Sequence, residues 1–135
     1  MKKHVKNLIT DFELLSSWEE KYEHLISLGN NIPIFEGIKA EGYLIRGCQS
    51  KVWLACKYKN GKLYFYGDSD ALITRGIVAL IIEIYSNSRP EEIINEKVDF
   101  FRTIGLQEHL SMTRANGLNI MLKTINKYAL KYYLK

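Results

Sequence analysis

Residues 51–66 constrain the fold most, because they predict a β-hairpin with a defined turn. Apolar residues alternate with other residues from 52 to 58, and an aromatic-rich run follows at 62–66. Between the runs stands Asn60-Gly61, a pair preferred in two-residue type I′ turns, whose central residues both need positive φ. Two strands alone are marginally stable, so we expect residues 43–45 to add a third. The sequence therefore predicts a small antiparallel sheet of about three strands.

Helical patterns lie before the hairpin. Ser17 followed by Glu20 is typical of a capping box, and it precedes an apolar stripe that ends at Gly29. Thr10 followed by Glu13 has the same spacing and predicts an earlier helix start. We therefore expect a helix at 18–29 and a shorter one that begins near residue 10.

Further helices are expected after the hairpin. Asp68 or Ser69 is suited to cap a helix that is apolar on nearly every side over 77–84, so this helix should be buried against the sheet. Pro90 opens a short helix, residues 98–104 predict another, and a last helix begins near Thr113. This order predicts one α+β domain over residues 1–135, with helices packed on one face of the sheet.

Composition excludes several classes of protein. Apolar residues make up 47% and charged residues 25% of the 135 residues, as in ordinary globular chains. The N-terminus lacks the apolar segment of a secretory signal, and no run approaches the roughly 20 residues of a membrane span. A cytoplasmic protein without membrane contact is expected. The net charge of +4 permits contact with nucleic acid, but no basic block with interleaved aromatic residues supports it.

Cys48 has neighbours that a structural thiol does not need. Gly47 before it permits an unusual backbone conformation. Arg46 and Lys51 bring positive charge, which is expected to lower the pKa of the thiol and raise its thiolate fraction. The glutamine and serine that follow it add hydrogen-bond donors. From these residues alone, a reactive and a structural thiol remain equally open.

Cys56 alternates with apolar strand residues, so it is predicted to be a buried structural thiol. The two cysteines, eight positions apart, match no zinc-ligand spacing, and no metal site is expected. A cysteine hydrolase would need a base, and none of His4, His24 and His109 lies near Cys48 in the sequence.

Two other stretches carry chemistry less specifically. Asp68 and Asp70 in "GDSD" are either paired carboxylates or helix-capping residues. Arg114 is either a solvated cation near a helix start or the partner of an acid. Gly117 within a predicted helix costs up to about 1 kcal/mol relative to alanine, so we expect it to allow close packing.

Four stretches together resemble the SufE family of sulfur acceptor proteins. In chain order they are "WEEKYEHLISLG" (18–29), "GCQSKVWL" (47–54), "GDSDALITRG" (67–76) and "LSMTRANGL" (110–118). The resemblance covers nearly the whole chain and implies the α+β fold of this family, which is similar to that of IscU-type scaffolds. Unlike those scaffolds, this chain lacks the three cysteines that would hold a cluster.

The resemblance also implies a function. Members of the family accept sulfur from a SufS-type cysteine desulfurase as a persulfide and pass it on to an iron–sulfur scaffold complex. Cys48 matches the acceptor, so the resemblance implies an activator and persulfide carrier without a cofactor of its own. The matching positions in the supporting and partner-binding stretches are Gln49, Ser50, Trp53, Asp70 and Arg114. Whether the protein is a monomer or a homodimer stays open.

Two alternatives belong to other classes. A cysteine-dependent thiol hydrolase or transferase acting on a small substrate would require a histidine beside Cys48. A basic nucleic-acid-binding module would use the tyrosine-rich hairpin and the lysines at the two ends of the chain. For the acceptor, we expect Cys48 on a loop before the Val52 strand, with its sulfur covered by apolar neighbours until the loop moves.

Overall fold

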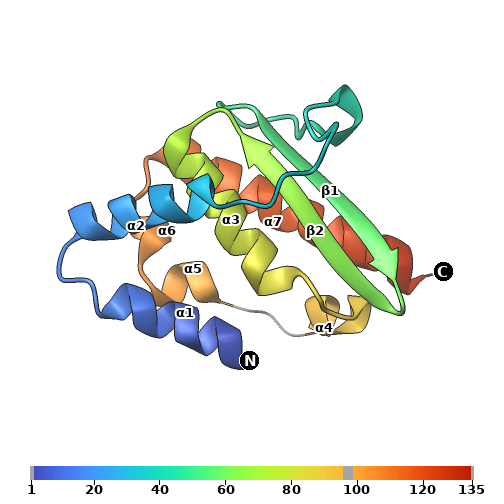
Figure 1. Ribbon diagram of the computed structural model, residues 1–135, viewed down its shortest axis with the longest axis horizontal. Helices are drawn as coiled ribbons and strands as arrows, with labels where there is room; N and C mark the ends of the chain where they lie inside the picture. The colour runs from blue at the N-terminus through green and yellow to red at the C-terminus, as the bar shows by residue number, and fades with distance from the viewer. Residues whose placement is uncertain (1, 96–98, 135) are drawn as a thin grey trace.

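The hairpin and seven α-helices make up the molecule, as far as the structure describes it (Figure 1). The computed structural model describes residues 2–95 and 99–134. Its elements are α1 (Lys3–Glu13), α2 (Trp18–Asn30), the 3₁₀ helix η1 (Glu41–Tyr43), β1 (Val52–Lys59), β2 (Lys62–Ser69), α3 (Leu72–Tyr85), α4 (Pro90–Asn95), α5 (Phe100–Thr103), α6 (Leu106–His109) and α7 (Met112–Tyr133). No helix in these ranges is both long and apolar enough to cross a bilayer.

The predicted hairpin is confirmed. β1 and β2 pair antiparallel, from Val52 opposite Ser69 to Lys59 opposite Lys62. The two turn residues have positive φ, 52° at Asn60 and 80° at Gly61. These are the conformations that a type I′ turn requires, and they match the right-handed twist of the strands. The turn therefore sets the register of the whole sheet.

The expected third strand is wrong. Residues 41–43 form η1 instead, and only Leu44 continues toward the sheet, as an isolated bridge to Trp53. The Ile45 amide then donates to the Val52 carbonyl at 2.8 Å. Gly47, with φ of +96°, turns the chain away before a longer ladder can form. The sheet accordingly has two strands within the described ranges.

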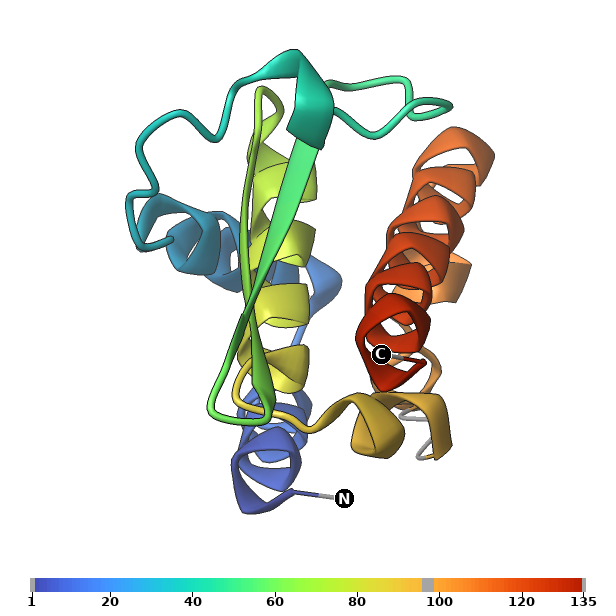
Figure 2. The same ribbon diagram turned by 90° about the vertical axis from the view of Figure 1, so that its right-hand side faces the viewer.

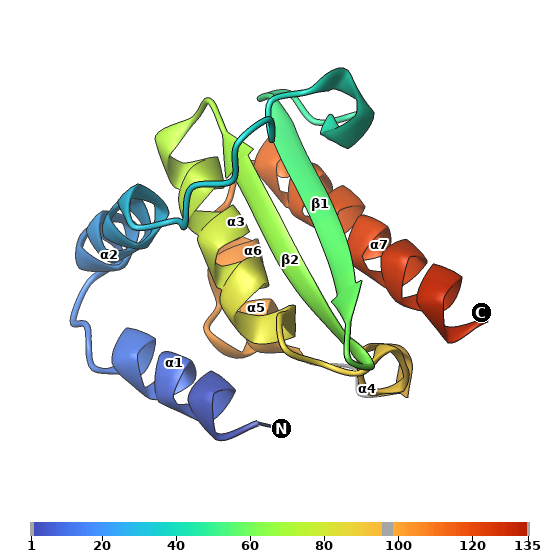
Figure 3. The ribbon, with the colours of Figure 1, turned by 45° about the vertical axis from the view of Figure 1, so that its right-hand side comes forward.

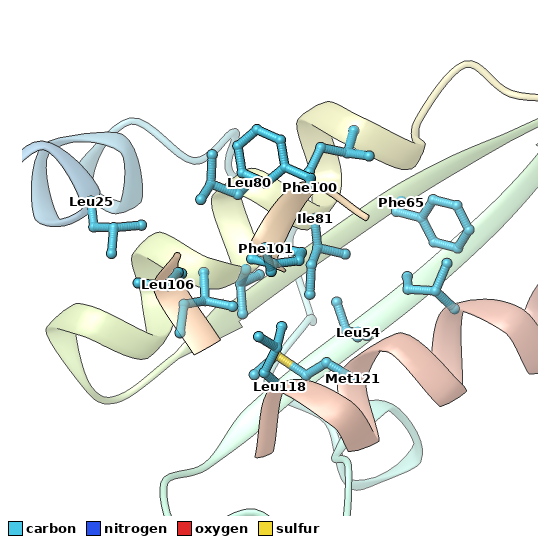
Figure 4. Packing of buried hydrophobic residues seen from close by; sticks show 14 of the residues in the cluster. Leu25, Leu54, Phe65, Leu80, Ile81, Phe100, Phe101, Leu106, Leu118 and Met121 are labelled. Carbon is cyan, nitrogen blue, oxygen red and sulfur yellow. The ribbon is translucent and has the colours of Figure 1, made fainter. Parts of the chain in front are cut away.

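Helices cover one face of the hairpin, as predicted. Side chains at Leu54 and Phe65 point to this face and join the core that α3 and α7 complete (Figure 4). The opposite face is covered by the segment between α2 and η1, where Ile38 packs with Trp53 and Ala55. Figure 2 views the hairpin nearly edge-on, with α7 on one side and this segment on the other. The molecule is thus layered around a two-stranded ribbon.

The two long helices behind the hairpin meet the expectations from their patterns. α3 is buried along most of its length, including Ile77 and Leu80. It approaches α2 so closely that a Cβ on Gly76 would overlap the backbone carbonyl of Leu25. α7 begins after Ser111, one residue before the predicted start, and Ser111 accepts a hydrogen bond from the Arg114 amide. The first turns of α3 and α7 lie near the same end of the hairpin, because Thr74 and Thr113 line one cavity.

The structure confirms one of the two predicted capping boxes and the helix start at Pro90. Ser17 accepts from the Glu20 amide at 3.2 Å, so the predicted start of α2 is confirmed. Thr10 is wrong as a cap: it lies inside α1, where its hydroxyl donates to a carbonyl of the preceding turn. The helix α4 begins at Pro90, as predicted.

Two expectations around α3 and α5 need correction. α3 follows Ala71 without a side-chain cap, so Asp68 and Ser69 do not cap it. The short helix expected at 98–104 is α5, which begins at Phe100; Val98 lies outside the described residues. Instead, Asp68 pairs with Arg75, and Asp70 accepts a hydrogen bond from the Lys51 amide.

Candidate functional site

Cys48 lies on a loop that leads into β1, as predicted. Gly47 before it has φ of +96°, which side chains rarely permit. A Cβ on Gly47 would also stand 3.0 Å from Cδ1 of Ile120 on α7. Glycine therefore serves two purposes here: it turns the loop, and it lets the loop approach α7 closely.

The sulfur of Cys48 rests against the first turns of α7. Its Sγ lies 3.9 Å from the carbonyl oxygen of Gly117, within reach of a weak S–H hydrogen bond. A Cβ on Gly117 would stand 3.7 Å from the same sulfur, in ordinary van der Waals contact. The close packing expected at Gly117 thus involves the Cys48 thiol. The side chain is half-buried and packs against the main core, so the sulfur is partly covered, and the expected cover is found only in part.

A cavity of about 280 Å³ opens beside the sulfur. Its apolar wall comes from Ile77 of α3 and Met121 of α7, both almost fully buried. The polar side includes Thr74, which is also buried, and Arg114, which is exposed. The lining residues are Cys48, Gln49, Ser50, Thr74, Ile77, Thr113, Arg114, Gly117 and Met121. The cavity is much larger than a single sulfur atom needs.

Burial raises the pKa of the Cys48 thiol above its ordinary value. This direction contradicts the expectation that neighbouring cations would lower it. Arg46 forms an exposed ion pair with Glu41 at 3.2 Å. The side chain of Lys51 is exposed as well. Loss of water around the sulfur outweighs these solvated charges, so the thiol is protonated at neutral pH.

The "GDSD" stretch holds the base of the Cys48 loop. A carboxylate oxygen of Asp70 accepts from the Lys51 amide at 3.0 Å, and the Asp70 amide donates to the Lys51 carbonyl at 3.2 Å. The buried hydroxyl of Ser69 donates to the same carbonyl at 2.8 Å. Asp68 is occupied elsewhere, in an ion pair with Arg75 at 3.1 Å. The two aspartates therefore act separately, and neither forms a carboxylate pair with the other.

The structure brings most of the predicted site residues together. Gln49, Ser50 and Arg114 line the cavity with Cys48. Asp70 acts on the loop through its bond to the Lys51 backbone. Trp53 does not join them: it lies on the opposite face of the sheet, buried in the smaller cluster.

Besides Gly117, four residues that line the cavity were not predicted as part of the site. Thr74 and Ile77 come from α3, and Thr113 and Met121 come from α7. Their sequence patterns indicate only helical positions, and nothing local links them to Cys48. The one available signal was Gly117, which marked the part of α7 that another group approaches closely.

The other candidate groups lie elsewhere. His4 bonds the Glu83 carbonyl at 2.8 Å, His24 packs edge-on against Phe12, and His109 stacks on Trp18. No histidine is among the cavity-lining residues, so the thiol has no imidazole base there. The described residues contain no group of three potential metal ligands.

Cys56 packs against the main core from β1, on the face predicted for it, but it is only partly buried, so the predicted burial is correct only in part. Burial raises the pKa of its thiol to about 12, against the smaller opposing effect of the Lys131 charge. Such a thiol carries almost no thiolate at neutral pH, which agrees with a structural role.

Comparisons with known proteins identify the family. The family model SufE, described as an Fe-S metabolism associated domain, matches residues 6–129. An uncharacterized SufE-like protein of Rhizobium meliloti (strain 1021) is 40% identical over 128 residues, which covers 90% of this chain and 91% of that protein. The solution structure of a hypothetical protein from Thermus thermophilus superposes with a TM-score of 0.79 at 21% identity, over 97% of this chain and 96% of that one. The chain therefore belongs to the SufE family of Fe-S metabolism associated proteins.

Proposed function

We propose that this protein accepts sulfur on Cys48 from a SufS-type cysteine desulfurase and delivers it for iron–sulfur cluster assembly. The observation that carries the proposal is the half-buried Cys48 sulfur beside a cavity of about 280 Å³, in a chain of the SufE family. The cavity provides room for an added sulfur atom, and the loop geometry restricts its contact with other thiols.

The transfer is an exchange at sulfur that needs no external oxidant. The Cys48 thiolate attacks the terminal sulfur of a persulfide on the desulfurase cysteine, and a new S–S bond forms on Cys48. The original S–S bond breaks, its electron pair leaves with the desulfurase thiolate, and that thiolate takes up the proton that Cys48 lost. The rate follows thiolate fraction, leaving-group pKa and access, as in thiol–disulfide exchange.

Because the pKa of Cys48 is raised at rest, the partner must activate this thiol when it docks. At rest the thiol is protonated and half-buried, so it reacts slowly with thiols or persulfides in solution. Docking of the desulfurase moves the loop, and exposure to water or to positive charge on the partner lowers the pKa. The acceptor is thereby activated where a sulfur donor is present.

The protein is proposed to work as an activator without independent turnover and without a cofactor of its own. Removing sulfur from the desulfurase frees that enzyme for its next cycle, which raises its rate. A thiol hydrolase or transferase is less well supported, because His4, His24 and His109 all make their contacts away from the Cys48 cavity. The iron–sulfur scaffold complex then receives the sulfur in a second exchange of the same kind.

Mass spectrometry after incubation with a SufS-type desulfurase and cysteine tests the proposal. The peptide that carries Cys48 should gain one sulfur atom, and alanine release by the desulfurase should rise. Cys48→Ser should abolish both effects, whereas Cys56→Ala, the matched control, should retain them. If Cys56→Ala abolishes the stimulation, or if the sulfur appears on the Cys56 peptide, the assignment to Cys48 is wrong.

A further inference from the structure

The outer edge of β1 is closed at its start and open toward the hairpin turn. The Val52 carbonyl accepts from the Ile45 amide at 2.8 Å, and the Leu54 carbonyl accepts from the Tyr128 hydroxyl at 3.1 Å. Beyond Leu54, no described residue forms a backbone hydrogen bond to this edge. In Figure 3, β1 is the outer strand of the hairpin, next to α7.

The strand register shows which groups face this edge. The backbones of Phe65 and Leu63 bond to the segment after α3, on the far side of β2. In an antiparallel ladder, the residues opposite them must direct their amides and carbonyls away from β2 as well. Those residues are Cys56 and Tyr58. Their four backbone groups therefore point outward along β1, where a further strand could bond to them.

A broad hollow of about 820 Å³ follows the open edge. It is lined from both faces of the hairpin, by Cys56, Lys57, Tyr58, Lys59, Asn60, Tyr64, Tyr66 and Tyr132. Tyr58 stacks on Tyr132 on one face, with ring centroids 5.1 Å apart, while Tyr64 and Tyr66 lie on the other. An added strand projects alternate side chains to the two faces, so each set would meet aromatic rings.

The charges around the edge are positive. Lys57, Lys59 and Lys131 are exposed, and none of them forms an ion pair with a carboxylate of the described residues. Lys57 lies over the rings of Phe35 and Tyr66, at 5.0 and 5.7 Å. A strand that carries Asp or Glu would therefore gain favourable contacts that this chain itself does not provide.

A second copy of the chain fits this edge poorly. When two β1 edges pair antiparallel, residues whose backbone groups point outward, such as Cys56 and Tyr58, must lie opposite each other. If Cys56 meets Tyr58, Lys57 faces the Lys57 of the second copy; if Tyr58 meets Tyr58, Lys57 faces Lys59. Both registers place like charges directly opposite, which destabilises a sheet. The remaining register, Cys56 against Cys56, needs Leu54, whose carbonyl is already bonded.

We propose that the open edge of β1 binds an extended acidic segment of a partner protein by strand addition. The interaction surface consists of the outward backbone groups of Cys56 and Tyr58, the flanking tyrosines, and Lys57 and Lys59. It is separate from the sulfur site, because the stretch of strand from Val52 to Cys56, where the surface begins, spans about 13 Å. Both surfaces can be occupied at once, and this surface does not depend on what Cys48 does.

Two labelled peptides test the proposal against the intact protein. The probes are fluorescein-labelled GEVEVEVEG and its basic counterpart GKVKVKVKG, followed by fluorescence anisotropy and by amide chemical shifts. The acidic peptide should bind, shift the amides of Cys56 and Tyr58, and weaken with added salt. The basic peptide should not bind. Lys57→Glu combined with Lys59→Glu should reverse this preference.

A proline variant separates backbone pairing from charge. Tyr58→Pro removes an outward amide that makes no ladder bond to β2, so the hairpin should persist. It should weaken binding of the acidic peptide about tenfold, whereas Tyr58→Val, which keeps the amide, should bind within about threefold of the native protein. Circular dichroism and the sulfur-acceptance assay report that both variants are folded.

Three results would overturn the proposal. One is the absence of binding by the acidic peptide up to about 1 mM, in which case the lysines only keep the edge from pairing. Another is equal binding by Tyr58→Pro and Tyr58→Val. The last is a dimer of the native protein that Tyr58→Pro dissociates, because the occupant would then be a second copy.

Discussion

Gly117→Ala tests why a glycine stands inside α7 beside the Cys48 sulfur. Alanine in a helix interior is more stable than glycine by about 1 kcal/mol. The new Cβ would lie 3.7 Å from Cys48 Sγ, which is ordinary contact and causes no overlap in the resting protein. The free energy of unfolding should therefore rise by about 1 kcal/mol. Resting packing alone gives no reason for glycine at this position.

The same methyl group should impair the protein once sulfur is added. A second sulfur bonded to Sγ lies about 2 Å beyond it, and on the Gly117 side it would overlap the new Cβ. Overpacking of this kind costs about 1–3 kcal/mol. Persulfide formation on Cys48 should accordingly fall about tenfold or more. We thus expect a more stable protein that accepts less sulfur.

Urea unfolding and mass spectrometry of the persulfide, run on the same preparations, decide the matter. Gly42→Ala is the matched control, because a Cβ there meets no atom within 4 Å and lies away from the cavity lining. It should keep normal sulfur acceptance. A less stable Gly117→Ala would refute the packing described here. A more stable Gly117→Ala with unchanged sulfur acceptance would refute the role of glycine in making room for sulfur.

Other perturbations give equally direct outcomes. Asp70→Ala removes the hydrogen bond to the Lys51 amide, worth about 1 kcal/mol at an exposed site, and should speed iodoacetamide alkylation of Cys48 about fivefold. Asp70→Asn should speed it less. An equal increase in the alkylation of Cys56 would indicate general unfolding instead. Because burial raises the pKa of Cys48, the rate of its alkylation should keep rising above pH 9, where the alkylation rate of free cysteine levels off. A plateau of the Cys48 rate at neutral pH would contradict this. The pKa of Cys56 is about 12 in the folded protein and near 9 in the unfolded chain. The contribution of this thiol to stability is therefore complete below pH 9 and is lost as the pH rises toward 12. Cys56→Ala should flatten the fall in unfolding free energy between pH 9 and pH 12. Ser17→Ala should cost about 1 kcal/mol of stability by removing the helix cap, without changing sulfur acceptance.

Local chemistry made the hairpin and several helix starts predictable. Asn60-Gly61 fixed the turn because few other pairs adopt positive φ at both positions. Ser17 and Pro90 marked helix starts through their own backbone and side-chain geometry. Thr10 carried the same spacing as Ser17, yet it lies inside α1, because the helical pattern before it extends back to Lys3.

The site was predictable only in part. The sequence singled out Cys48 and Gly47, whose φ confirms the unusual backbone. The cavity depends on α3 and α7 meeting, and residues such as Thr74 and Met121 carry no local mark of that meeting. The direction of the Cys48 pKa was predicted wrongly, because charges are visible in a sequence and burial is not. Trp53 was grouped with Cys48 only because both fall on the motif of the family resemblance, but the strand alternation sends its side chain to the other face.

The hydrogen bonds at the two ends of the Cys48 loop determine how this loop opens. The bond from Ile45 to Val52 and the bonds from Asp70 to Lys51 close the loop at its base, outside the β1–β2 ladder. The loop is therefore a small cooperative unit of its own, which can open while the ladder stays intact. The amides of Ile45 and Lys51, which these bonds hold, should exchange with solvent through this local opening, and those of β1 that face β2 only on global unfolding. A partner that docked on this loop would have to supply only the free energy of the local opening, so Cys48 can become accessible while the rest of the fold stays stable.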